Sequence, residues 1–118
     1  NLFFRNHKGN AHYLVILNCD SIMDIHKIER QLRQGKLSFA SPQRLMKYLG
    51  LEPGSVSPFG LINDLQRHVT IFLDRSLQQA ERLSFHPCIN TASLIITNED
   101  FLRFLNHCGN AYSWIDLY

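Results

Sequence analysis

Apolar residues along the chain fall into short runs that predict strands, alternating with stretches whose apolar residues recur at helical spacing. The runs 2–4 and 12–17 are separated by the polar, glycine-containing segment 6–10, and this order predicts a hairpin of two strands. Segment 24–32 has apolar residues at positions i, i+3 and i+7, so it predicts an amphipathic helix.

Capping residues predict where two further helices begin and end. Ser41 precedes a proline, a pair typical of an N-cap and a first helical position, and the helix that follows should end at Gly50. A last helix should begin after Thr97 or Asn98 and end at Gly109. Its predicted apolar side consists of Phe101, Leu102, Leu105 and Cys108.

The remaining apolar runs predict additional strands, with one long loop between them. The segment 51–64 holds two prolines, two glycines and two serines, so we expect a loop with one helical turn at 59–63. Strands and helices mix without strict alternation. The pattern therefore predicts one α/β domain with a mixed, largely antiparallel sheet packed by helices. The further strands are expected at 37–40, 69–73, 82–85, 92–97 and 112–115.

Length and charge exclude several classes of protein. The 118 residues fit one domain, and no segment approaches the roughly 20 apolar residues that span a bilayer, so we expect a soluble chain with no membrane partner. Three cysteines cannot all pair within the chain, and no CxxC motif is present, which favours reduced thiols in the cytoplasm. The formal net charge of +2 does not demand a nucleic-acid partner.

Basic residues nevertheless cluster in one short stretch. They are Arg30, Arg33, Lys36, Arg44 and Lys47. Two interpretations remain open: a solvated helix face, which is the more common outcome for such a pattern, or a surface that touches the end of a tRNA.

The sequence contains none of the common catalytic and metal-binding motifs considered below. The six histidines show neither HxxxH nor HExxH spacing, so we expect no metal and no cofactor. GxSxG, P-loop and GxGxxG motifs are also missing. The loop Gly54-Ser55-Val56-Ser57-Pro58 stands out, because small residues between Gly and Pro leave backbone groups available to a ligand. An ordinary connector is the alternative interpretation.

Four segments in register resemble the YbaK/ProX family of aminoacyl-tRNA deacylases. They are the opening strands at 1–4 and 12–15, the segment 36–41, the GxxxP loop 54–58 with its continuation to 61 and 63–64, and Phe85-His86-Pro87 with Asn90-Thr91-Ala92. The similarity covers nearly the whole chain. It implies a YbaK-like domain over 1–118 with a curved sheet, and His-Pro with Asn-Thr is similar to the ProX branch.

The resemblance implies a function as well as a fold. Members hydrolyse the ester of mischarged tRNA, and the ProX branch acts on alanine attached to proline tRNA, which makes tRNA and prolyl-tRNA synthetase the expected partners. The loop residues Gly54, Ser55, Val56, Ser57 and Pro58 would hold the scissile ester. The residues expected to bind the substrate are Asn1, Gly60, His86, Asn90 and Thr91. Orienting a water or the ribose hydroxyl and stabilising the oxyanion would supply the catalysis without a metal.

One departure from the family pattern keeps other functions open. Family members usually carry a Lys directly before the residue that matches Asn1, and the sequence begins at that residue, so we expect the N-terminal part of the domain to be missing. A catalytically inactive tRNA-binding or regulatory module of the same fold is the main alternative. A deacylase for Cys-tRNA(Pro) and a fragment of a synthetase insertion are two others.

Overall fold

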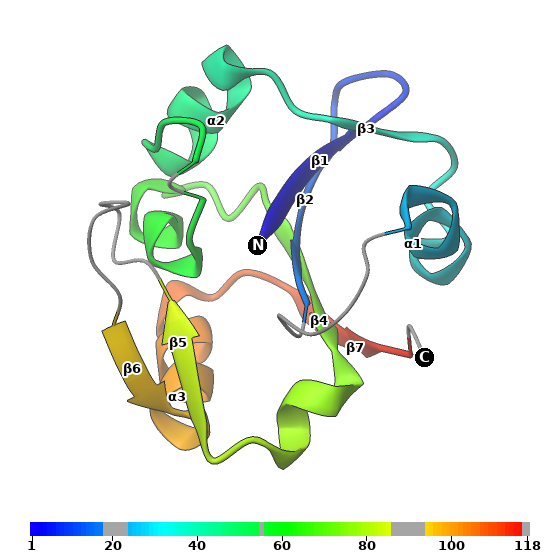
Figure 1. The fold of residues 1–118 in the computed structure, drawn as a ribbon. Coiled ribbons are helices and arrows are strands. Elements are labelled where there is room, and N and C mark those ends of the chain that lie inside the picture. Colours follow the sequence, from blue (N-terminus) through cyan, green and yellow to red (C-terminus); the bar gives the residue numbers. More distant parts are fainter. Residues whose placement is uncertain (18–23, 55, 86–93, 117–118) are drawn as a thin grey trace.

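The computed structural model describes residues 1–17, 24–54, 56–85 and 94–116. Within these residues the chain forms seven strands, three α-helices and two 3-10 helices (Figure 1). In chain order they are β1 (Leu2–Asn6), β2 (His12–Ile16), α1 (Ile25–Leu32), β3 (Leu37–Phe39), α2 (Pro42–Leu49), η1 (Pro58–Asn63), β4 (Thr70–Asp74), η2 (Arg75–Gln79), β5 (Arg82–Phe85), β6 (Leu94–Thr97), α3 (Asn98–Cys108) and β7 (Tyr112–Ile115).

Five of the strands form one mixed sheet in the order β3-β1-β2-β4-β7. β1 pairs antiparallel with β2 and with β3, whereas β4 pairs parallel with β2 and with β7. β5 and β6 form a separate antiparallel hairpin. The predicted α/β fold with a mixed sheet is confirmed. In the described five-stranded sheet, antiparallel and parallel pairings are equal in number, so the antiparallel majority depends on the separate hairpin.

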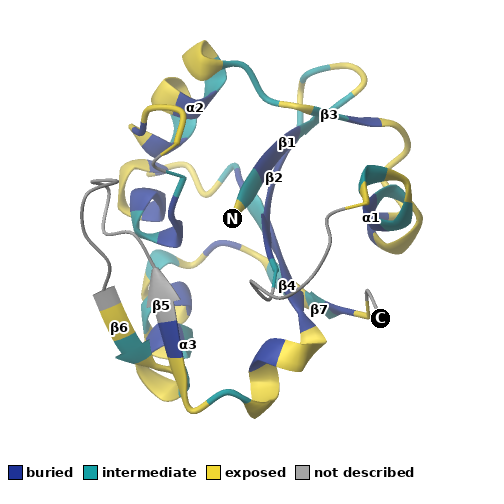
Figure 2. Ribbon diagram, viewed as in Figure 1, coloured by how far each residue is buried: buried dark blue, intermediate teal, exposed yellow. Residues whose placement is uncertain are grey.

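Helices cover both faces of this sheet, and its central strand β2 is buried along its whole length. Alternate residues of a strand point to opposite faces, and Phe3 and Phe4 accordingly belong to two different apolar clusters. The cluster around Phe4 includes Ile28 and Leu32 of α1. The cluster around Phe3 includes side chains of α2, η1 and α3. Figure 1 shows α1 on one side of the sheet and α2 and α3 on the other, and Figure 2 shows the buried strands between them.

The predicted helix boundaries are confirmed by their capping contacts. The Ser41 Oγ accepts a hydrogen bond from the Arg44 N–H at 3.3 Å, and α2 ends at Gly50, whose φ of 66° lies in the left-handed region that favours glycine. Thr97 caps α3 in the same way, with its Oγ1 accepting from the Asp100 N–H at 3.1 Å. Local chemistry therefore defines both helices that frame the sheet on this face.

One short element was not predicted from the sequence. η2 follows β4 directly, and its first turn is capped by the Asp74 carboxylate, which accepts from the Ser76 N–H at 3.1 Å.

The lengths and hydropathy of the helices bear on membrane insertion. In the part of the chain that the structure describes, no helix is long and apolar enough to cross a bilayer.

Candidate functional site

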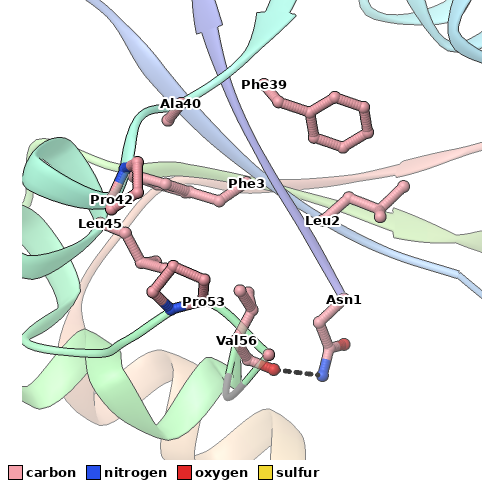
Figure 3. Close-up of a pocket in the computed structure, with 10 residues that line it drawn as sticks. Asn1, Leu2, Phe3, Phe39, Ala40, Pro42, Leu45, Pro53 and Val56 are labelled. Carbon is pink, nitrogen blue, oxygen red and sulfur yellow. Dashed lines mark hydrogen bonds between the residues drawn. The ribbon is translucent and has the colours of Figure 1, made fainter.

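A pocket of about 300 Å³ lies where the first residues of the chain meet the start of α2 and the loop before η1 (Figure 3). Three separate segments form its walls, and each is held by a different part of the fold. The lining residues are Asn1, Leu2, Phe3, Phe39, Ala40, Pro42, Leu45, Pro53, Gly54 and Val56. The fold therefore brings the predicted residues Asn1, Gly54 and Val56 together at one cavity.

A hydrogen bond connects the start of the chain to the predicted loop. The Asn1 Nδ2 donates to the Val56 carbonyl oxygen at 3.3 Å, as the dashed line in Figure 3 shows. Gly54 adopts a φ of 86°, a left-handed conformation that other residues rarely take. The loop thus turns sharply at Gly54 and presents its backbone to the cavity, with the Asn1 amide beside it.

The last two residues of the predicted loop have a structural role. The Ser57 side chain is fully buried, and its Oγ caps η1 by accepting from the Phe59 N–H at 3.2 Å. Pro58 is the buried first residue of η1. Neither residue lines the pocket. Because the Ser57 hydroxyl is already used as a cap, any contact of Ser57 with a ligand would fall to its backbone.

Gly60, predicted to bind substrate, also lies outside the pocket lining. It is buried within η1, and a Cβ at this position would lie 2.8 Å from the Leu49 carbonyl oxygen and 2.7 Å from a methyl group of Leu51. The close approach of η1 to the end of α2 therefore requires glycine here, which is a packing role. The predicted site residues Ser55, His86, Asn90 and Thr91 lie outside the described residues.

The chemistry of the lining residues is mostly apolar. None of them has a side chain that titrates, and the Asn1 amide is the polar side chain among them. None of the described side chains that line the pocket can therefore act as a general acid or base. The pocket can bind a small apolar group and leave polar recognition to the Asn1 amide and the backbone of the loop. Among the described residues there is also no group of three or more His, Cys, Asp or Glu side chains positioned to hold a metal ion.

A buried polar cluster, which the sequence did not reveal, lies behind the pocket between β2 and α2. The His12 side chain is fully buried, and its Nδ1 lies 2.8 Å from the His68 Nε2. Its Nε2 lies 3.0 Å from an Nη of Arg44. Tyr48 stacks on His68 with ring centroids 4.4 Å apart, and Phe3 stacks on His12 at 5.7 Å.

The hydrogen bonds of this cluster specify a neutral His12. A guanidinium only donates, so the His12 Nε2 must accept from Arg44 and the proton must lie on Nδ1, which donates to His68. The pKa of His12 is lowered from 6.5 to about 4, mainly because burial disfavours the charged ring, with smaller electrostatic contributions from the neighbouring His68 and Arg44. Because Arg44 belongs to α2, the cluster fixes the helix whose Pro42 and Leu45 line the pocket.

A second buried network holds the chain that follows the loop. The Asp64 carboxylate accepts from the N–H groups of His68 and Val69 at 3.1 and 2.8 Å and from the Asn110 Nδ2 at 2.8 Å. Asn63 donates from its Nδ2 to the Leu49 carbonyl oxygen at 2.9 Å. Asn63 and Asp64 belong to the motif that suggested the family, and in the structure their hydrogen bonds hold the end of η1 in place.

The structure defines an α/β domain with a small apolar pocket beside a glycine-containing loop, and comparison with known proteins identifies its family. Residues 1–104 match the family model described as the aminoacyl-tRNA editing domain. The chain is 38% identical over 117 residues to the prolyl-tRNA editing protein ProX of Acetoanaerobium sticklandii, which covers 99% of this chain and 71% of that protein. The chain belongs to the aminoacyl-tRNA editing domain family, and the resemblance inferred from the sequence is confirmed.

Animal relatives and solved structures agree with this assignment. The chain is 34% identical over 107 residues to prolyl-tRNA synthetase associated domain-containing protein 1 of Danio rerio, covering 89% of this chain and 58% of that protein. A crystal structure described as that of a candidate trans-editing enzyme for prolyl tRNA synthetase has a TM-score of 0.70 at 23% identity, covering 98% and 67% of the two chains. At that identity the structural likeness supports the fold alone.

Proposed function

We propose that this chain hydrolyses the ester of mischarged aminoacyl-tRNA, and that its preferred substrate is alanine attached to proline tRNA. The observation that supports this most is the apolar pocket bounded by Asn1, Gly54 and Val56, with no titrating side chain among its described walls. The identity of 38% to a protein named as a prolyl-tRNA editing protein points to the same substrate class.

An aminoacyl ester suits a site of this composition because it is already activated. A water, oriented by the substrate's own ribose hydroxyl, attacks the carbonyl carbon. The bond to the ribose oxygen breaks, that oxygen takes up the proton that the water loses, and the free amino acid and an intact tRNA are released. Orientation and stabilisation of the oxyanion by backbone N–H groups can supply most of the rate. In this proposal the backbone around Gly54 holds the ester, and no metal takes part.

The specificity in this proposal depends on size. Proline is larger than alanine, so a closed wall can reject it by steric overlap, which is the easier direction of discrimination; rejecting a smaller substrate gains only about 1–3 kcal/mol per missing methylene. From the resemblance we assign that wall to the family motif that contains His86, Asn90 and Thr91. The apolar side chains of Phe3, Ala40 and Leu45 would contact the methyl group of alanine.

A deacylation assay tests the proposal. Ala-tRNA(Pro), Cys-tRNA(Pro) and Pro-tRNA(Pro) are compared side by side, with and without EDTA, for the wild type and for His86→Ala. The expected result is fastest cleavage of the alanyl ester, no effect of EDTA, and loss of both alanine cleavage and size exclusion in the variant. Faster cleavage of the cysteinyl ester would reassign the substrate. Binding of tRNA without cleavage of any ester would make the chain a binding module.

A further inference from the structure

A second hollow lies at the opposite end of β1 from the candidate site. Its volume is about 410 Å³, and it opens between the β1–β2 turn and the turn that leads from α1 into β3. Its lining residues are Asn6, His7, Lys8, Asn10, Gln34, Gly35 and Lys36. In contrast to the apolar pocket, this hollow combines two lysines with amide side chains.

The turn that forms this hollow is rigidly held. The Asn6 Oδ1 accepts from the N–H groups of Asn10 and Ala11 at 3.0 and 3.2 Å, and its Nδ2 donates to the Asn10 Oδ1 at 2.7 Å. From beneath, an Nη of Arg44 donates to the Gly9 carbonyl oxygen at 2.7 Å. The position of Lys8 at the tip is therefore fixed at its backbone, while its ammonium group is free to reach a ligand.

Among the described residues, no carboxylate pairs with either lysine of the hollow. In the described ranges, neither Lys8 nor Lys36 forms a salt bridge, and both side chains are exposed. The nearest acidic residue in sequence to Lys36 is Glu29, whose carboxylate already accepts from the Leu37 N–H at 3.0 Å and lies 3.6 Å from His26. The positive charge of the hollow is thus available to an anion.

Charge is also divided between the two halves of the chain. Residues 1–50 contain eight of the twelve Lys and Arg and three of the ten Asp and Glu, a formal charge of +5. Residues 51–118 contain four and seven, a formal charge of −3. In Figure 1 the β1–β2 turn, β3 and α2 lie in the upper part of the molecule, while β5, β6 and α3 lie in the lower part. The small net charge of the chain therefore conceals an excess of positive charge in residues 1–50.

We propose that the hollow at the β1–β2 turn binds phosphates of the RNA backbone, with Lys8 and Lys36 as the contacting residues. This inference rests on the proposed function, and it names the face along which the tRNA lies. β1 runs from the apolar pocket at Asn1 to the hollow at Asn6, a distance of about 17 Å at roughly 3.4 Å per residue. A stacked strand advances about 3.4 Å per phosphate, so on the order of five phosphates span this distance. The lysines would meet the RNA several nucleotides before its esterified end.

The test measures the salt dependence of tRNA binding by the wild type and by the double variant Lys8→Gln/Lys36→Gln. For a single strand, each neutralised phosphate contributes about 0.7 to the magnitude of the slope of log affinity against log salt concentration. Because the double variant removes two such contacts, the magnitude of its slope should be smaller by about 1.4, and it should bind tRNA on the order of tenfold more weakly at low salt. The matched control is Arg82→Gln/Arg103→Gln, which removes the same charge from the other half of the chain and should leave the slope unchanged.

A short substrate separates this inference from the proposed function. The double variant should hydrolyse alanyl-adenosine like the wild type, because that ester ends before the lysines, while it cleaves Ala-tRNA(Pro) on the order of tenfold less efficiently at low salt. Equal slopes for the wild type and the double variant would overturn the inference, whether or not esters are cleaved. So would binding to anionic lipid vesicles that the double variant loses while it keeps its affinity for tRNA. If the wild type cleaves no ester but the slope difference persists, the proposed function fails and the RNA-binding hollow stands.

Discussion

The two ends of β1 differ in the chemistry they offer, although a single five-residue strand connects them. At Asn1 the walls are apolar, none of the described lining side chains titrates, and the polar groups are an amide and backbone atoms. At the β1–β2 turn the hollow holds Lys8 and Lys36 with no carboxylate partner among the described residues. An ester can react at the first end without competition from charged side chains, and an anion can be held at the second. In the two proposals made above, β1 thus separates the site of the ester from the charge that holds the RNA.

Between these two ends lies the buried cluster of His12, His68 and Arg44. It connects the β1–β2 turn to α2, because Arg44 bonds both the Gly9 carbonyl oxygen and His12. The same helix supplies Pro42 and Leu45 to the apolar pocket. Variants that act on one end alone should therefore be distinguishable from variants of the cluster, which act on stability.

The largest effect is expected at the apolar end, for Gly54→Val. A β-branched residue is strained at a φ of 86°, and its side chain would displace the loop from the ester. A shift of about 1 Å can lower the rate roughly 100-fold, so hydrolysis of alanyl-adenosine should fall by about that factor while circular dichroism stays unchanged. The matched control is Gly35→Val. Gly35 has a similar φ of 81°, and a Cβ added there would meet open space, so its substitution imposes the same backbone strain but should leave alanyl-adenosine hydrolysis intact. Unchanged turnover of a folded Gly54→Val would remove the loop from the mechanism.

A second prediction concerns stability against pH and the cluster between the two ends. The pKa of His12 is about 4 in the folded protein, whereas its ordinary value, taken for the unfolded chain, is 6.5. Between pH 6.5 and 4 the unfolded chain therefore binds a proton at His12 that the folded chain does not bind. The contribution of His12 is thus fully favourable above pH 6.5 and is lost as the pH falls from 6.5 to 4. The loss is on the order of 3 kcal/mol.

Urea denaturation at several pH values measures the contribution of His12 to the free energy of unfolding. His12→Phe keeps an aromatic ring beside Phe3 and Tyr48 and should be less stable than the wild type at pH 7, yet its stability should fall less between pH 6.5 and 4. His26→Gln is the control, since the His26 side chain is 80% exposed and should contribute little. Parallel pH profiles for the wild type and His12→Phe would show that His12 is not the buried titrating group.

Local sequence chemistry predicted the elements but not the contacts between distant ones. Capping residues such as Ser41 and Thr97 located α2 and α3 because a helix end is determined by a few adjacent side chains. The parallel pairing of β2 with β4 and the contact of His12 with His68 join residues more than fifty positions apart, and no periodicity reports such pairs. A histidine in an otherwise apolar strand was the available signal for the cluster.

Some residues of the candidate site could be predicted from the sequence, and others could not. The loop at Gly54 was recognised by its small residues, and the resemblance added Asn1. The pocket walls from β3 and α2 were not predicted, since Phe39, Ala40 and Leu45 look like ordinary strand and helix residues until the fold places them beside the loop. The roles expected for Ser57 and Gly60 followed from the motif and stay predictions. The structure adds that the Ser57 side chain caps η1 and that Gly60 allows η1 to pack closely on the end of α2.

The smallest effect is expected for Asn1→Asp, which tests the contact between the start of β1 and the loop. The substitution keeps the shape of the side chain but replaces the donor of the bond to the Val56 carbonyl by an acceptor. One partly exposed hydrogen bond of this kind contributes about 0.5–1.5 kcal/mol, so kcat for alanyl-adenosine should fall by roughly two- to tenfold. Asn63→Asp is the matched control, because Asn63 makes the same amide-to-carbonyl bond to Leu49 away from the pocket. It should lower the thermal midpoint without lowering kcat. If both variants lowered kcat equally, the effect of Asn1 would be one of general stability. A fall confined to Asn1→Asp would assign its amide to positioning the loop at the ester.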